Sequence, residues 1–370
     1  MSTASDPFPI TPTVHSPGPD HVLPRPCAAV SRGRWPRRGG PAPALAALLL
    51  AVVAACSTSA ASPSPSSPVT ITDDEGTSVT IGAQPARIVS LAPSVTETLF
   101  ALGEGSRVVG VTASDDYPPQ VKSLPQVATF TGVEAEKVVA ARPDLVIGWK
   151  GITSAADIAR LRSLGLTVMV LYAQTVDRVL ADIALVGHAT GADGAAGSLV
   201  SSLRSRIDGI SAAAAAAPTH PRVFYELDAT KAIYGLAPDD FTTDLIRHAG
   251  GDPITSGTPG VYTISIERLV SADPQVILLG DAAYGTTVSA VRSRPGWGGI
   301  TAVRSGAVRP IDDIIVTRPG PRIADGLAAL AEAIHPGLVL PPGSTSTPGS
   351  SGSGAGAEPG ASAATSSTAP

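Results

Sequence analysis

The chain has 370 residues, with 26 Lys and Arg against 31 Asp and Glu, and a formal net charge of −5. This acidic balance, with no cluster of basic residues along the folded part, argues against binding to nucleic acid. The only cysteines are Cys27 and Cys56, so the chain after residue 56 has neither a disulfide nor a thiolate metal site.

The first 55 residues have the features of a secretory signal peptide with an unusually long N-terminal extension. Arg34, Arg37 and Arg38 precede an apolar run at 44–55, which ends in Val-Ala-Ala immediately before Cys56. A basic region, a short apolar region and small residues at the cleavage point are typical of such signals. The apolar run is shorter than the roughly 20 residues that a membrane-spanning helix needs.

Cys56, placed directly after Val-Ala-Ala, resembles the lipobox cysteine of bacterial lipoproteins. In that family the cysteine becomes the acylated N-terminus, and its acyl chains hold the protein on the membrane. The alternative is a free or buried cysteine. Residues 56–68 are rich in Ser and Pro and are expected to form a lipidated flexible tether. Residues 341–370 are rich in Gly, Ser, Pro and Ala, and a disordered tail is expected there.

The first part of the body alternates predicted strands and helices. Residues 69–81 alternate in hydrophobicity around Asp-Glu-Gly and predict a β-hairpin. After an apolar strand at 87–91, Pro93 with Ser94 as cap and Glu97 three residues later predict a capping box at the start of a helix. Further strands are predicted at 108–111, 145–147 and 167–171, with a helix at 154–164. This alternation is typical of a parallel sheet covered by helices.

Residues 177–217 have helical periodicity and many alanines, with Gly191 to Gly197 expected to divide them into two helices. Strand and helix alternation then resumes and ends in a helix at about 321–334. We therefore divide the body into an N-terminal lobe at 69–190, a linking helix at 191–218 and a C-terminal lobe at 219–340. The predicted fold class is α/β, with parallel sheets in two lobes.

One short pattern occurs twice, and each copy begins with a glutamate. Glu136 opens Glu-Lys-Val-Val-Ala-Ala-Arg-Pro, and Glu267 opens Glu-Arg-Leu-Val-Ser-Ala-Asp-Pro. Each copy predicts a short helix with an acid in its first turn, ended by the proline and followed by a buried strand. Because one copy lies on each side of the helical span, the pattern indicates an equivalent unit in each lobe. The alternative is two unrelated helix–strand connections.

Residues 87–103, Arg-Ile-Val-Ser-Leu-Ala-Pro-Ser-Val-Thr-Glu-Thr-Leu-Phe-Ala-Leu-Gly, resemble the opening of the helical-backbone (class III) substrate-binding proteins of ABC importers. These proteins serve the uptake of cobalamin, haem and iron-siderophores. Segments 114–119, 130–132 and 147–151 are most similar to the cobalamin-binding branch. The resemblance covers the whole body and implies two Rossmann-like lobes joined by a long helix, with the ligand in the cleft between them.

The resemblance implies that the ligand is cobalamin or a related corrinoid. Haem and iron-siderophore remain alternatives because Phe130 and the turn around Tyr262 depart from the cobalamin-branch pattern. The resemblance also implies that Glu136 and Glu267 dock onto arginines of a permease dimer. The alternative for each glutamate is a surface acid favoured by the helix dipole.

A large, flat and mostly apolar ligand needs aromatic faces and a few directed hydrogen bonds. Aromatic residues make up only 4% of the chain, so those at predicted strand ends are informative. The candidate ligand-binding residues are Tyr117, Phe130, Trp149, Lys150, Tyr262, Asp313 and Arg318. Trp149, flanked by Gly148 and Gly151, is expected to be exposed. The alternatives are core packing for the aromatic residues and a surface ion pair for Arg318.

An enzyme is the competing class, but the chain has neither a P-loop, a complete G-x-G-x-x-G nor a G-x-S-x-G motif. The four histidines of the body are too scattered in sequence to predict a metal site. The sequence therefore predicts a binding protein without a cofactor, a monomer attached to the extracytoplasmic face of the cell membrane through its lipid anchor alone.

Overall fold

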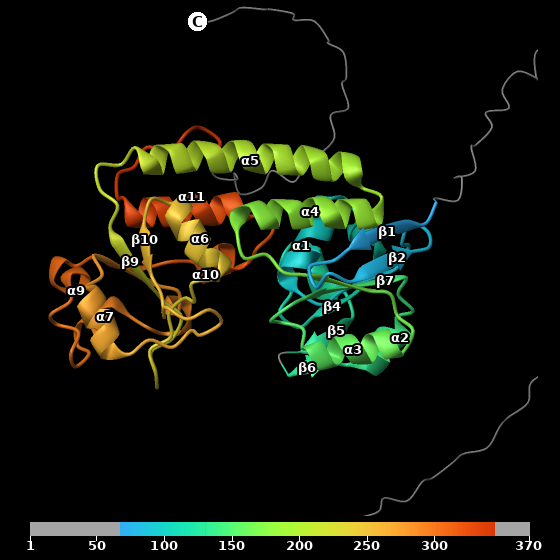
Figure 1. Ribbon diagram of the computed structural model, residues 1–370, viewed down its shortest axis with the longest axis horizontal. Coiled ribbons are helices and arrows are strands. Elements are labelled where there is room, and N and C mark those ends of the chain that lie inside the picture. Colours follow the sequence, from blue (N-terminus) through green and yellow to red (C-terminus); the bar gives the residue numbers. More distant parts are fainter. Residues whose placement is uncertain (1–66, 130, 345–370) are drawn as a thin grey trace, which may run out of the picture. The chain divides into compact units, whose positions relative to one another are not determined.

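Two β-sheets built mainly from parallel strands organise the computed structural model, which describes residues 67–129 and 131–344 (Figure 1). The signal segment, the lipidation site at Cys56, most of the tether, Phe130 and the tail after residue 344 lie outside the described residues.

The first sheet has six strands and belongs to the N-terminal lobe. Their spatial order is β6 (Gly132–Val133), β5 (Gln126–Thr129), β4 (Val108–Thr112), β3 (Ile88–Ser90), β7 (Leu145–Trp149) and β8 (Val168–Leu171). Only β5 and β6 pair antiparallel in this sheet. Strands β3 and β7 are buried at every residue, as expected of a parallel sheet covered on both faces. The other elements of this lobe are α1 (Pro93–Ala101), α2 (Ala135–Ala140), α3 (Ala155–Ser163), the 3₁₀ turns η2 (Gly105–Arg107) and η3 (Pro119–Ser123), and the antiparallel hairpin β1 (Val69–Thr72) and β2 (Ser78–Ile81).

The second sheet has four parallel strands and belongs to the C-terminal lobe. Their spatial order is β10 (Asp252–Ile254), β9 (Arg222–Glu226), β11 (Val276–Leu279) and β12 (Val308–Pro310). The helical elements of this lobe are α6 (Phe241–His248), α7 (Ile266–Ala272), the 3₁₀ turn η4 (Ala282–Tyr284), α8 (Val288–Arg292), α9 (Thr301–Ser305) and α10 (Asp313–Thr317).

Three helices connect the lobes on one side of both sheets: α4 (Val176–Thr190), α5 (Asp193–Ala215) and α11 (Ile323–Ile334). Figure 1 shows α5 running across both lobes, above α4 and α11. One hydrophobic core includes side chains from these helices and from both sheets, for example Ile147 of β7, Ile207 of α5 and Leu278 of β11. The opposite face of each sheet has a separate core. The predicted two-lobe α/β fold is confirmed, and the shared core resists separation of the lobes because it is close-packed.

The helical span divides at a single point rather than over a seven-residue break. Gly191 takes the left-handed conformation, φ 74°, and caps α4, and α5 begins at Asp193. Gly194 and Gly197 lie inside α5, so the prediction that the break extends from Gly191 to Gly197 is wrong. One left-handed glycine is enough to end a helix, and the chain needs no further loop before the next helix begins.

The predicted capping box at the start of α1 is also wrong. Ala92 is the N-cap residue, and no side chain caps this helix. Ser94 lies within the first turn, and Glu97 is 2% exposed and points to the other lobe. A capping pattern and a buried ion pair use the same residue types, so local spacing does not separate them.

The repeat predicted from the sequence has one structure in both lobes. Glu136 and Glu267 lie in the first turns of α2 and α7, and strands β7 and β11 follow these helices. Arg142 and Asp273, each directly before the proline, have φ angles of 46° and 42°. In the part of the chain that the structure describes, they are the two non-glycine residues with positive φ. The shared left-handed turn shows that the repeat is a structural unit.

An arginine at the start of a central strand holds the end of each of these helices. Arg87 donates from Nε to the carbonyl oxygens of Ala141 (2.9 Å) and Arg142 (3.1 Å). Its backbone N–H donates in return to the carboxylate of Asp144 at 2.9 Å.

The C-terminal lobe repeats this arrangement. Arg222 donates from Nε to the carbonyl oxygens of Ala272 (2.8 Å) and Asp273 (3.2 Å), and its backbone N–H donates to Gln275 at 3.0 Å. We call these two sets the arginine clamps; they satisfy helix-terminal carbonyls that have no partner within the helix.

Candidate functional site

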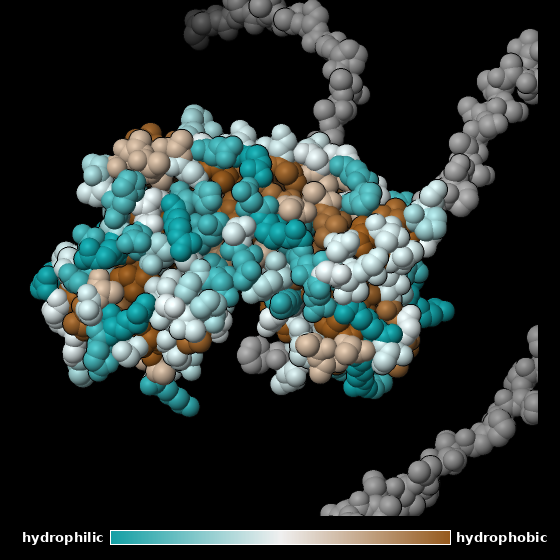
Figure 2. Space-filling model, viewed as in Figure 1, coloured by the Kyte–Doolittle hydropathy of each residue, from teal (hydrophilic) through white to brown (hydrophobic). Residues whose placement is uncertain are grey.

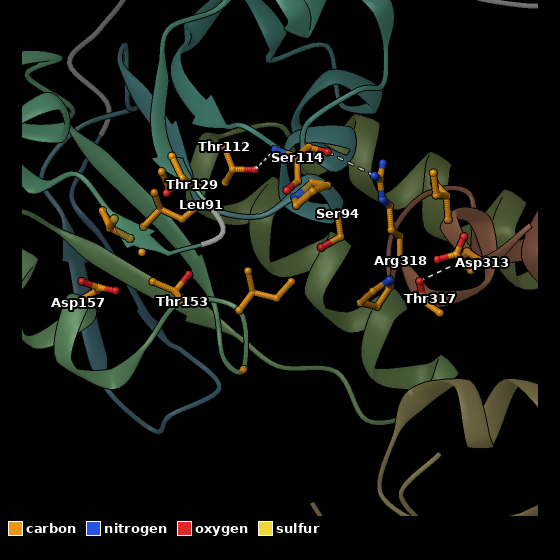
Figure 3. Close-up of a pocket in the computed structure, with 18 of the residues that line it drawn as sticks. Leu91, Ser94, Thr112, Ser114, Thr129, Thr153, Asp157, Asp313, Thr317 and Arg318 are labelled. Atoms are coloured by element: carbon orange, nitrogen blue, oxygen red, sulfur yellow. Dashed lines mark hydrogen bonds between the residues drawn. The ribbon is translucent and has the colours of Figure 1, made fainter. Parts of the chain in front are cut away.

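A cavity of about 530 Å³ lies between the two lobes, at the carboxyl ends of the strands of the first sheet (Figure 3). Leu91 follows β3, Thr112 ends β4, and Thr153 follows β7. Residues of α10 and the segment after it line the cavity from the C-terminal lobe. The carboxyl edge of a parallel sheet is the usual ligand site in open α/β folds.

The lining combines apolar side chains with hydroxyl groups and few charges. The hydroxyl groups belong to Ser94, Thr112, Ser114, Thr129, Thr153, Tyr284 and Thr317. The charged residues are Asp157, Asp313 and Arg318. Ser94 is 3% exposed, and its Oγ has no hydrogen-bond partner. A lining of this kind suits a largely apolar ligand that carries hydrogen-bonding groups at its edges.

Arg318 lies on the cavity lining and is bound to the N-terminal lobe. Its Nη1 donates to Oε1 of Glu97 (3.0 Å) and to Oδ1 of Asp116 (2.5 Å). Its Nη2 donates to the carbonyl oxygen of Ser114 at 3.4 Å, an interaction visible in Figure 3. Burial opposes the charge of Arg318, but the hydrogen bonds to Asp116 and Glu97 outweigh burial and raise its pKa. Arg318 therefore lies at the cavity and is also ion-paired, but its pairs are half-buried and join the two lobes, unlike the surface pair of the alternative.

Asp313 also lines the cavity, from the first turn of α10. Burial and the neighbouring Asp312 raise the pKa of its carboxyl group. The carboxylate oxygens of Asp313 can accept hydrogen bonds from amide N–H groups of a ligand.

The prediction that Trp149 is exposed is wrong. Its side chain is 7% exposed and belongs to the large hydrophobic core. Trp149 ends the buried strand β7, and its direction follows from the alternation of side chains along that strand; Gly148 and Gly151 do not turn it outward. It is absent from the lining of the interlobe cavity.

Other predicted ligand-binding residues lie outside the cavity lining. Tyr117 is 46% exposed, and the guanidinium of Arg322 lies 4.5 Å from the centre of its ring. The ammonium group of Lys150 lies 4.8 Å from the ring centre of Tyr172. Phe130, the remaining aromatic candidate of the N-terminal lobe, lies outside the described residues.

Tyr262 is held within the C-terminal lobe. Its hydroxyl donates to Oδ2 of Asp240 at 3.0 Å, and burial together with the Asp240 carboxylate raises the pKa of this tyrosine. The side chain is 38% exposed, but it does not line the interlobe cavity.

Sequence reasoning missed Tyr284. This residue ends the turn η4 after strand β11, is 77% exposed, and lines the cavity from the C-terminal lobe. The signal was present in the sequence, because a tyrosine in a Gly-rich segment just after an apolar strand meets the same criterion that selected Trp149. Tyr284 is the aromatic side chain of the described lining, so it replaces Trp149 as the aromatic candidate.

Glu136 and Glu267 lie away from the cavity lining, on exposed helix faces. Nη2 of Arg160 donates to Oε1 of Glu136 at 2.8 Å, and these side chains are 56% and 83% exposed, respectively. Hydrogen bonds from its own backbone N–H and from Ser265 lower the pKa of Glu267, so this carboxylate is ionised at neutral pH. The structure thus presents one exposed carboxylate from the same repeat position on each lobe.

In residues 67–129 and 131–344, no three or more His, Cys, Asp or Glu side chains are arranged to hold a metal ion. The described helices include none that is both long and apolar enough to cross a membrane. The face shown in Figure 2 is mixed, with hydrophilic and intermediate residues around hydrophobic ones over α4 and α5.

The chain matches the family described as "Periplasmic binding protein" over residues 88–314. An uncharacterized ABC transporter substrate-binding lipoprotein of Bacillus subtilis is 36% identical over 274 residues, which are 73% of this chain and 86% of the relative. A cobalamin-binding protein of Halobacterium salinarum is 32% identical over 282 residues, covering 73% and 75% of the two chains. A vitamin B12-binding protein of Vibrio cholerae is 29% identical over 243 residues, covering 65% and 86%.

Two solved structures are also similar to this chain in fold and in sequence. The periplasmic vitamin B12 binding protein of Vibrio cholerae has a TM-score of 0.60 and 28% identity, covering 68% of this chain and 97% of that chain. A periplasmic heme-binding protein from Roseiflexus sp. RS-1 has a TM-score of 0.60 and 27% identity, covering 67% and 98%.

Proposed function

Because the chain belongs to the periplasmic binding protein family, we propose that it captures cobalamin or a related corrinoid for an ABC importer. Two relatives that share about three tenths of their residues with it are named for cobalamin or vitamin B12 binding. The lipoprotein name of the Bacillus subtilis relative supports acylation of Cys56 and attachment to the extracytoplasmic face of the membrane. The proposed partners are the ligand, a permease dimer and the membrane, and the protein acts as a monomer.

The composition of the interlobe cavity supports a corrinoid ligand. Apolar residues such as Leu91, Ile152 and Ile314 alternate with hydroxyl groups from both lobes. A corrinoid has an apolar ring with neutral amide groups around its edge, and hydroxyl and carboxyl side chains pair well with amides. With two aspartates and one arginine that is already paired, the lining favours a neutral or cationic ligand over an anionic one.

Haem is the second candidate, supported by the heme-binding structural neighbour and by Tyr284. Tyrosine is one of the residues that hold haem iron in proteins. Haem also carries two carboxylates, which need cationic partners, and the cationic side chain of the described lining is Arg318 with its two carboxylate partners. The cavity therefore favours the corrinoid.

Titration of the purified protein with cyanocobalamin, haemin and a ferric siderophore, followed by calorimetry, tests the ligand. We expect a submicromolar dissociation constant for cyanocobalamin and weaker binding of the other two. Tight binding of haemin with no heat from cyanocobalamin would overturn the corrinoid assignment and favour the second candidate.

We further propose that Glu136 and Glu267 dock onto cationic side chains of the permease dimer. Two exposed carboxylates at equivalent positions of two lobes suit a partner with two equivalent cationic sites. Charge reversal of both glutamates to lysine should abolish uptake by cells and leave the affinity for the ligand unchanged. Normal uptake by the doubly reversed protein would contradict this role.

A further inference from the structure

Each of the two helices that carry these glutamates also exposes a valine one turn later. Val139 on α2 is 43% exposed and Val270 on α7 is 38% exposed. The same number of residues separates the two valines as separates Glu136 from Glu267. Residues three apart on a helix lie on the same face, so each glutamate has a valine beside it.

Other side chains of these helices contact their own lobes. Val138 and Leu269 are fully buried. Nζ of Lys137 donates to Glu134 at 2.8 Å, and Nε of Arg268 donates to the carbonyl oxygen of Thr255 at 3.2 Å. The basic residue after each glutamate is therefore hydrogen-bonded within its lobe, and the exposed face of each helix carries a carboxylate next to an apolar side chain.

A single exposed valine is ordinary on a protein surface and needs no explanation. Two exposed valines at matched positions of a repeat, each next to an exposed carboxylate, are a different observation. The arginine clamps of Arg87 and Arg222 fix both helices in the same way against their strands. The two faces are thus presented as equivalent surfaces, which a partner with two-fold symmetry can contact in the same manner.

We propose that Val139 and Val270 form the apolar half of each docking surface, beside the acidic half formed by Glu136 and Glu267. This inference rests on the docking role proposed above. The fitting partner is a two-fold symmetric permease surface that presents, twice, a cationic side chain next to an apolar one. The exposed pair of Glu136 with Arg160 contributes little by itself, so a cation of the partner can replace Arg160.

Substitution of both valines by asparagine tests the apolar half. Asparagine is polar and uncharged and has a helix propensity close to that of valine, so folding is preserved. The full-length protein is produced in native cells at graded levels, and uptake of labelled cyanocobalamin, or of the ligand that the titration identifies, is measured at each level. For Val139→Asn with Val270→Asn, the amount of protein that gives half-maximal uptake should rise on the order of tenfold, and isoleucine at both positions should restore it. Ligand affinity should not change.

Varying the ionic strength distinguishes the contribution of the valines from that of the glutamates. Salt screens charges but leaves apolar contacts intact, so the defect of the asparagine variant should persist at high salt in the medium. Val339→Asn, at a valine that is 86% exposed and outside the repeat, is the matched control and should leave uptake unchanged.

The outcomes distinguish the two proposals. If reversal of both glutamates has no effect on uptake, the docking role itself fails. If reversal abolishes uptake but the asparagine variant has the half-maximal amount of the unmodified protein, only the apolar contribution is overturned. An equal defect in Val339→Asn would show a general effect of surface polarity and would also overturn it.

Discussion

Glu97 of α1 and Arg322, which precedes α11, form a two-pronged ion pair that joins the N-terminal lobe to the C-terminal lobe. Nη2 and Nε of Arg322 donate to Oε1 (2.6 Å) and Oε2 (2.8 Å) of Glu97, and Arg318 donates to the same carboxylate. The carboxylate side chain is 1% exposed and is paired with both of these arginines. Because Arg318 lines the cavity and shares Glu97 with Arg322, this contact connects the cavity lining to the contact between the lobes.

Substitution of Glu97 by glutamine should lower the free energy of unfolding by about 3–5 kcal/mol, because it leaves the half-buried Arg322 without a carboxylate partner and leaves Arg318 with Asp116 alone. Urea unfolding of the purified protein measures this change. Glu134→Gln is the control, since its pair with Lys137 is exposed and should contribute less than about 1 kcal/mol. Equal losses of unfolding free energy in the two variants would show that the interlobe ion pair contributes no more to stability than an exposed pair.

Trp149 should contribute to stability, and Tyr284 should contribute to ligand binding, which is the role that the sequence predicts for Trp149. Trp149→Ala removes a buried core side chain and should cost about 3–5 kcal/mol of stability, whereas Trp149→Phe should bind the ligand normally. Tyr284→Ala removes an exposed ring of the cavity and should weaken ligand binding about tenfold with little change in stability. Calorimetric titration and urea unfolding of the three variants check both statements, and normal affinity in Tyr284→Ala would contradict the second.

Asp182 should make the stability depend on pH. This residue of α4 is 3% exposed, and burial raises the pKa of its carboxyl group to about 7, despite the nearby Arg178. The folded protein therefore holds the Asp182 proton up to a higher pH than the unfolded chain does. Because the folded state binds more protons between the two pKa values, the contribution of Asp182 to the free energy of unfolding falls as the pH rises from about 4 to about 7.

The variant Asp182→Asn lacks this titration. The free energy of unfolding of Asp182→Asn minus that of the unmodified protein should increase by about 2–3 kcal/mol between about pH 5 and about pH 8. Asp177→Asn, on the same helix with a side chain that is 79% exposed, is the matched control and should show no such trend. Parallel pH profiles for Asp182→Asn and the unmodified protein would rule out this role.

Arg142 and Asp273 occupy the same strained turn, yet glycine should have opposite effects at the two positions. Arg142→Gly relieves a left-handed backbone and should change the free energy of unfolding by less than about 1 kcal/mol, in the stabilising direction. Asp273→Gly also removes the carboxylate that accepts the backbone N–H of Thr301 at 2.7 Å and its hydroxyl at 2.8 Å, so it should lose about 1–3 kcal/mol. Unfolding curves of the two variants give the signs, and the same sign for both would refute this account.

Much of the fold is encoded in local sequence. The alternation of apolar strands with amphipathic helices predicts the two sheets, and the repeat that begins at Glu136 and Glu267 predicts a helix, a proline stop and a buried strand that the structure contains twice. These predictions succeed because strand burial, helix ends and proline stops depend on residues close together in the chain.

The candidate site depends on contacts between distant segments, and there the sequence misleads. Glu97 has the spacing of a helix cap, but the arginine of the other lobe is a stronger partner than a helix N-terminus already started by Pro93. Trp149 has the glycine neighbours of an exposed loop, but the packing of β7 against the shared core buries it. Tyr284 lines the cavity because its turn faces the N-terminal lobe. The sequence alone determines the two lobes and the matched glutamates. Only the tertiary structure decides which side chains meet between the lobes, because those contacts depend on how two separately formed sheets pack on α4, α5 and α11.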